Sequence, residues 1–91
     1  MEASEIKVVG RVQGVGFRMF TLTSATELGI RGWVKNLPDG SVLCRALGDG
    51  AAMAQFRLCL RKGPTFSRVE ALEETPLDAE TLAFVGFHIR H

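Results

Sequence analysis

The chain has 91 residues, of which 46% are hydrophobic, and its formal net charge is +1 at neutral pH. This length provides one domain with a two-layer core and leaves no room for a second domain. The near-neutral charge argues against nucleic acid as the main partner, because binding to a phosphate backbone normally requires a concentrated basic surface. No apolar segment approaches the ~20 residues that cross a bilayer, so no membrane partner is expected.

The N-terminal part of the chain predicts a strand followed by a helix. The first five residues are expected to be flexible and to precede a single domain of residues 6–91. They lack the basic start and the apolar run of a signal peptide, which predicts a cytoplasmic protein. Residues 6–13 alternate like a strand, and residues 17–28 place apolar side chains on one face of a helix that Gly29 ends as a left-handed cap.

A hairpin is expected in the middle of the chain. Strands over residues 30–37 and 41–47 flank the segment Pro38-Asp39-Gly40. Proline presets φ there and glycine supplies the positive-φ position, which is typical of a tight turn. The two strands are therefore expected to pair.

The remaining residues predict a second helix and one or two further strands. Asp49 is a candidate N-cap for this helix, and Gly63-Pro64 ends it after residue 62. A strand over residues 67–73 and a loop over residues 75–80 come next. The last strand is expected over residues 84–90, with three inward-facing side chains: Val85, Phe87 and Ile89.

This order of elements, β-α-β-β-α-β with an added C-terminal strand, matches the ferredoxin-like α+β fold. The fold has a mainly antiparallel sheet with two helices on one face. Its first two strands run parallel, with the third strand between them in the opposite direction. Their C-terminal ends therefore lie at the same edge of the sheet, about 9–10 Å apart.

A loop with glycines at positions 14 and 16 joins the first strand to the first helix. Such a loop lets a ligand approach the backbone, and a helix N-terminus presents free N–H groups and a partial positive charge. Arg18 adds a cation where the helix dipole disfavours one by about 0.3–1 kcal/mol. We therefore predict a phosphate or carboxylate site; the alternative is a structural turn followed by a solvated arginine.

Common nucleotide-binding patterns do not fit this loop. A Walker A motif needs Gly-Lys-Ser/Thr after its second glycine, and Phe17-Arg18 follows Gly16 here. The dinucleotide fingerprint needs a further glycine or alanine at the position of Met19. Nucleotide binding is therefore not expected.

Asn36 lies at the end of the second strand, at the edge that also carries the glycine loop. Asparagine is often only a turn residue. Because Pro38-Asp39-Gly40 already supplies the turn chemistry, a second interpretation is that the Asn36 carboxamide holds a water molecule or a substrate oxygen.

No metal site, cofactor or covalent nucleophile is expected. Cys44 and Cys59 lack the additional Cys or His ligands of a zinc site and are expected to be small buried side chains. The aspartates lie in separate turns, and no histidine is placed to activate a hydroxyl group. Both histidines, His88 and His91, are expected to be exposed rather than catalytic.

Two blocks of residues together resemble the acylphosphatase family. They are Gly10-x-Val12-Gln13-Gly14-Val15-x-Phe17-Arg18 and Gly32-Trp33-Val34-x-Asn36-x-x-Asp39-Gly40. The resemblance extends over nearly the whole chain from Ile6. It implies a small ferredoxin-like enzyme that hydrolyses the carboxyl-phosphate bond of acyl phosphates without a cofactor.

The resemblance also implies roles for particular residues. Arg18 and Asn36 correspond to the catalytic arginine and asparagine of the family. The backbone cradle for the phosphate corresponds to Val15, Gly16, Phe17, Arg18 and Met19. Asn36 has no acidic or basic group at neutral pH, so its expected task is to orient the attacking water.

Two other functions remain open at this point. A non-catalytic anion sensor or RNA module would keep the loop but would not require Asn36. A carbamoyl-phosphate-handling partner subunit would restrict activity to that substrate. A monomeric, stand-alone enzyme that acts on a small-molecule acyl phosphate is the expectation that we test below.

Overall fold

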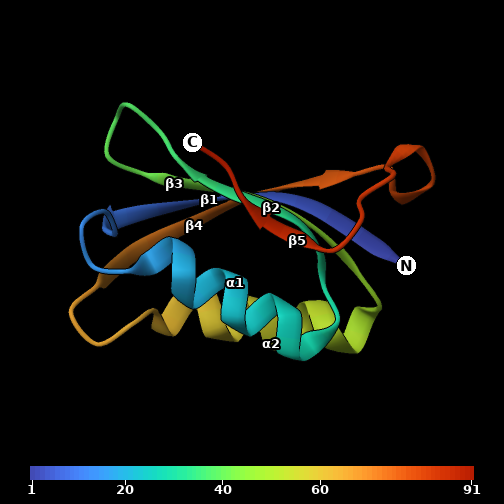
Figure 1. Cartoon of the computed structure of the whole chain (residues 1–91), viewed down its shortest axis with the longest axis horizontal. Coiled ribbons are helices and arrows are strands. Elements are labelled where there is room, and N and C mark those ends of the chain that lie inside the picture. The colour runs from blue at the N-terminus through green and yellow to red at the C-terminus, as the bar shows by residue number, and fades with distance from the viewer.

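The computed structural model describes all 91 residues as one sheet covered by two helices on the same face (Figure 1). In chain order, the elements are β1 (Glu2–Arg11), α1 (Phe17–Leu28), β2 (Arg31–Asn36), β3 (Val42–Gly48), α2 (Gly50–Lys62), β4 (Arg68–Leu77), a 3₁₀ turn (Ala79–Thr81) and β5 (Phe87–Ile89). The expected ferredoxin-like α+β fold is confirmed. Neither helix has the length and apolar character that a membrane-crossing helix needs.

The sheet has the strand order β4-β1-β3-β2-β5. β3 is antiparallel to both β1 and β2, and the short β5 is parallel to β2. β1 and β2 therefore run in the same direction, and their C-terminal ends share the edge at the left of Figure 1. This arrangement brings the loop after β1 and the end of β2 to one side of the molecule, as the sequence predicts.

The core lies between the sheet and the two helices. Burial alternates along most of β1 and β3, where every second side chain faces the helices, whereas Gly32, Trp33 and Val34 of β2 are all buried. The largest fully buried side chains of the core are Phe17, Phe56, Ile6, Met53, Leu60, Val8, Val12, Val34 and Val42. Cys44 is buried among them, and this burial raises the pKa of its thiol; Cys59 is only half-buried, contrary to expectation.

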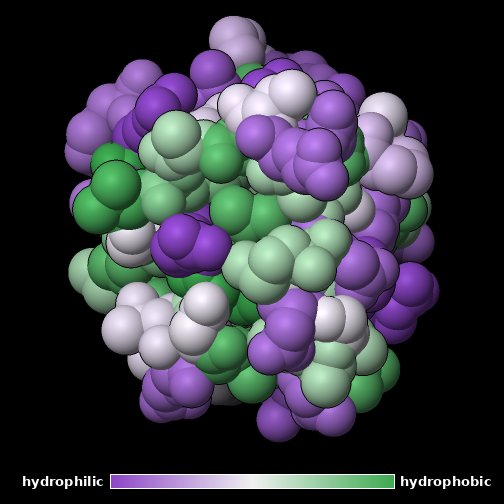
Figure 2. Space-filling view, turned by 90° about the vertical axis from the view of Figure 1, so that its right-hand side faces the viewer, coloured by the Kyte–Doolittle hydropathy of each residue, from purple (hydrophilic) through white to green (hydrophobic).

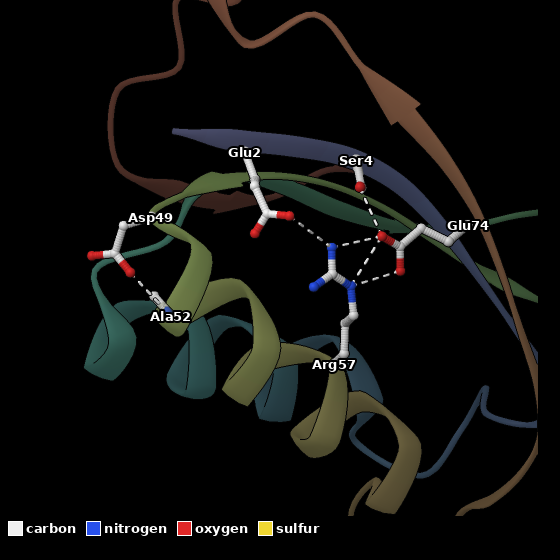
Figure 3. Close-up of polar contacts among 6 residues, drawn as sticks. All are labelled: Glu2, Ser4, Asp49, Ala52, Arg57 and Glu74. Atoms are coloured by element: carbon white, nitrogen blue, oxygen red, sulfur yellow. Dashed lines mark hydrogen bonds and ion pairs between the residues drawn. The ribbon is translucent and has the colours of Figure 1, made fainter.

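Both helices begin and end where the sequence predicts. Gly29 has φ 70° and caps α1 in the left-handed conformation, and its N–H donates to the carbonyl of Thr26 at 3.2 Å. Asp49 caps α2, because its carboxylate accepts a hydrogen bond from the N–H of Ala52 at 2.8 Å (Figure 3). These ends are determined locally, which is why sequence patterns find them.

Two strand boundaries were wrong for a common reason. The N-terminal segment, expected to be flexible, is part of β1 from Glu2, and β4 continues to Leu77 instead of ending at residue 73. The two extensions pair with each other, from Glu5 with Thr75 to Ala3 with Leu77. Pro76 fits because β4 is an edge strand. This pairing is a tertiary contact, and the local turn residues on which the expected end of β4 is based do not reveal it.

The last strand is also shorter than expected. β5 begins at Phe87, and Val85 is 82% exposed instead of inward-facing. Gly86 has φ 66° and redirects the chain just before β5, where its carbonyl accepts a hydrogen bond from the N–H of Gly32. The segment before β5 lies at the end of the molecule far from the β1 loop (Figure 1). Figure 2 shows this end, where hydrophobic residues extend from the centre to the left margin and hydrophilic residues lie mainly at the top, right and bottom.

An ion-pair network joins α2 to the sheet (Figure 3). Nε and Nη2 of Arg57 donate to the carboxylate of Glu74 on β4, with the closest contact at 2.8 Å. The buried hydroxyl of Ser4 donates to the same carboxylate at 2.8 Å. These hydrogen bonds, with that from Arg57 as the largest cause, hold the pKa of Glu74 below its ordinary value of 4.5.

This network predicts an acid-sensitive part of the stability. Because the pKa of Glu74 is lower in the folded chain, its contribution is fully present above pH 4.5 and is lost as the pH falls through the folded value. We expect Glu74→Gln to lower the free energy of unfolding by about 1 kcal/mol at neutral pH, with the difference shrinking in acid. Urea unfolding at several pH values measures it. Glu73→Gln, at an exposed neighbouring position, is the control; an equal pH dependence in both variants would contradict the assignment.

Candidate active site

A cavity of 350 Å³ lies at the shared edge of β1 and β2. Its walls come from the end of β1, the following loop, the first turn of α1, the end of β2 and the C-terminal residues. The lining residues are Val12, Gly14, Gly16, Phe17, Arg18, Met19, Asn36, Ile89 and His91. The structure thus brings Arg18, Asn36 and three of the other four predicted loop residues to one cavity.

The exception among the predicted residues is Val15. Its side chain packs against the hydrophobic core and does not line the cavity. The Phe17 side chain is also a core residue, with only 2% of its surface exposed, and it fixes the start of α1. Met19 points outward and is 59% exposed. The contribution of these three residues to an anion site therefore has to come from the backbone.

The backbone of the loop has the conformation that such a site requires. Gly14 and Gly16 have φ values of 74° and 77°, in the left-handed region that disfavours other residues. Gly16 is the N-cap of α1, and no side chain caps this helix end. The first α1 hydrogen bond runs from the N–H of Phe20 to the carbonyl of Gly16 at 3.0 Å. The N–H groups of residues 15–19 precede it and have no acceptor in the chain.

Arg18 adds a positive side chain to this helix end. No ion pair within the chain involves its guanidinium. Nη1 of Arg18 contacts Nδ1 of His91 at 3.2 Å, and because a guanidinium only donates, the imidazole nitrogen is the acceptor. No carboxylate neutralises the arginine, so its charge remains for a bound anion.

Asn36 lines the cavity from the end of β2. It is the last residue of β2, pairs in register with Val42 of β3, and is half-buried. None of the side-chain hydrogen bonds within the chain uses its carboxamide. Its oxygen and its NH₂ group are therefore both free to bind a water molecule or a ligand.

Two residues of this region were missed by the sequence reasoning. His91 is exposed as expected, but it lines the cavity because β5 pairs with β2, a tertiary contact that no local pattern reveals. Gln13 links the loop to the β2–β3 turn through hydrogen bonds to the carbonyls of Leu37 and Ser41. The sequence signal that could have identified Gln13 is its position in the first motif block, directly before the glycine loop.

Two other cavities are less suited to an anion. One of 410 Å³ is lined by Glu2, Arg57 and Glu74, whose charges already pair with one another. The other, of 320 Å³, is lined by Lys7 and by three acids, Asp39, Glu70 and Glu73. No group of three or more His, Cys, Asp or Glu side chains is arranged to hold a metal ion.

The fold and this cavity define a small ferredoxin-like α+β protein with a glycine loop, an arginine and an asparagine at one sheet edge. A family model described as Acylphosphatase matches residues 4–89. An acylphosphatase from Actinobacillus pleuropneumoniae is 56% identical over 84 residues, which are 91% of each chain. One from Oceanobacillus iheyensis is 44% identical over the full length of both chains. The crystal structure of acylphosphatase from Bacillus subtilis superposes with a TM-score of 0.94 at 37% identity and complete coverage of both chains. The chain therefore belongs to the acylphosphatase family of enzymes.

Proposed function

We propose that the chain hydrolyses the carboxyl-phosphate bond of small acyl phosphates to a carboxylate and inorganic phosphate. The observation that carries this proposal is one cavity with three complementary parts. They are a row of free backbone N–H groups, a guanidinium without a carboxylate partner and a free carboxamide at the end of β2. Family membership supports the same reaction.

The phosphoryl group is held by the loop and by Arg18. Its oxygens accept hydrogen bonds from the N–H groups of residues 15–19, where the dipole of α1 adds a partial positive charge. The guanidinium of Arg18 binds two phosphoryl oxygens as a fork, with charge-assisted hydrogen bonds. The same groups stabilise the charge that spreads over these oxygens as the P–O bond breaks.

The attacking water is oriented by Asn36. Its carboxamide holds the water in line with the bond to the leaving carboxylate, and this alignment replaces a general base. The water oxygen forms a bond to phosphorus, and the P–O bond to the acyl group breaks with its electron pair on the carboxylate. The proton of the water passes to a phosphoryl oxygen. A carboxylate is a good leaving group, so no general acid is required.

Hydrolysis of benzoyl phosphate in H₂¹⁸O, with EDTA present, tests this proposal. We expect turnover that EDTA leaves unchanged, because the N–H groups and Arg18 supply the positive charge, and ¹⁸O in the inorganic phosphate. A phosphate monoester such as p-nitrophenyl phosphate is the control and should be hydrolysed far more slowly, because its phenolate leaving group is more basic than a carboxylate and therefore poorer. Label in the benzoate, or absence of turnover, would contradict the proposal.

A further inference from the structure

Gln13 joins the two halves of the site. It lies between β1 and the glycine loop, and its Nε2 donates to the carbonyl of Leu37 at 2.8 Å and to that of Ser41 at 2.9 Å. These two residues flank the β2–β3 turn, and Leu37 directly follows Asn36. Both hydrogens of one carboxamide thus hold the hairpin against the segment that leads into the phosphate-binding loop.

The hairpin closes by its own backbone without Gln13. The N–H of Leu37 donates to the carbonyl of Ser41 at 2.9 Å, and the N–H of Gly40 donates to the carbonyl of Leu37 at 3.2 Å. Gln13 adds a further donor to each of the two carbonyls. Its contacts are therefore not needed to form the turn, and their effect is to fix the turn relative to the loop.

β1 has one other side-chain anchor on the same turn. Nζ of Lys7 contacts the carboxylate of Asp39 at 2.8 Å, but the two side chains are 34% and 53% exposed. Solvent screens such a pair, so it contributes little. Gln13 is half-buried and binds next to Asn36, which makes it the anchor that controls this side chain.

We propose that Gln13 is a positioning residue that sets the alignment of the Asn36 carboxamide with the phosphate held by the loop. This inference rests on the function proposed above. The N–H groups of residues 17–19 belong to the first turn of α1, and Val15 packs against the core, so most of the loop stays in place without Gln13 and phosphate binding depends little on it. The chemical step depends strongly on it, because a misplacement of about 1 Å at a reacting centre lowers a rate by as much as ~10²-fold.

A double-mutant cycle tests this coupling. We expect Gln13→Met to lower kcat for benzoyl phosphate by about tenfold or more, with the inhibition constant of inorganic phosphate within about threefold of wild type. In an Asn36→Ala background the same change should lower kcat no further. Lys7→Met, which removes the other anchor, should leave kcat within about twofold. An equal loss from Gln13→Met in both backgrounds, or no loss in either, would overturn the inference.

Gln13→Glu gives a second readout that a merely structural role would not change. Its carboxylate cannot donate to the two carbonyls, but its protonated form can donate to one of them. The ratio of its kcat to that of wild type should therefore rise as the pH is lowered from about 8 to about 5. A constant ratio would contradict the positioning role. If wild type itself shows no turnover, the proposed function is wrong. If wild type is active and both Gln13 variants keep a kcat close to that of Lys7→Met, only the positioning role is wrong.

Discussion

Asn36→Ala is expected to lower kcat for benzoyl phosphate by about 10²–10³-fold while the inhibition constant of inorganic phosphate changes little. The carboxamide lines the cavity from the end of β2, outside the loop, and has no hydrogen-bond partner in the chain, so we expect its removal to take away a contact to the water and none to the phosphoryl oxygens. Steady-state kinetics with phosphate as a product inhibitor separates the two effects.

Lys62→Ala is the control for this substitution. Lys62 is exposed in the last turn of α2 and lies outside the cavity, so both constants should remain those of wild type. The proposed role of Asn36 is wrong if its removal weakens phosphate binding as much as turnover, because the carboxamide would then hold the phosphate itself.

Arg18→Ala is expected to act on binding as well as on turnover. The guanidinium is the only side-chain charge among the loop residues that line the cavity, and no carboxylate neutralises it. Its loss should raise the inhibition constant of phosphate and lower kcat/KM by about 10²–10³-fold or more. Calorimetric titration with phosphate and the kinetics of benzoyl phosphate hydrolysis together measure this change.

Arg18→Lys distinguishes charge from geometry in this role. A lysine keeps the positive charge but loses the planar fork that binds two oxygens. We expect it to recover part of the phosphate affinity and less of kcat, because the fork matters most for the transition state. Full activity with lysine would show that the charge alone suffices and would contradict the bidentate contact.

Elements set by local signals were predictable from the sequence. The ends of α1 follow from Gly16 and Gly29, and the start of α2 follows from Asp49. The parallel course of β1 and β2 follows from the order of the elements, and this course predicts that Arg18 and Asn36 lie at one sheet edge, as they do. Local chemistry and connectivity thus sufficed for the fold and for placing these two side chains at one edge, whereas their proposed catalytic roles rest on the family resemblance.

Features that depend on distant pairing were not predictable. The first residues of β1 and the last residues of β4 are strands because they pair with each other. Neither segment alone carries a local sequence pattern that predicts this pairing. His91 enters the cavity only because β5 pairs with β2. The partners of Gln13 are backbone carbonyls more than twenty residues away, which carry no side-chain signature. Each of these features is a tertiary contact.

The most direct test compares wild type and Asn36→Ala in the hydrolysis of benzoyl phosphate with EDTA present, alongside calorimetric titration of both with phosphate. The account predicts that both bind phosphate equally and that only wild type turns the substrate over at an appreciable rate. Phosphate binding without turnover in wild type, which a non-catalytic anion-binding module would show, or undiminished turnover in the variant, would contradict it.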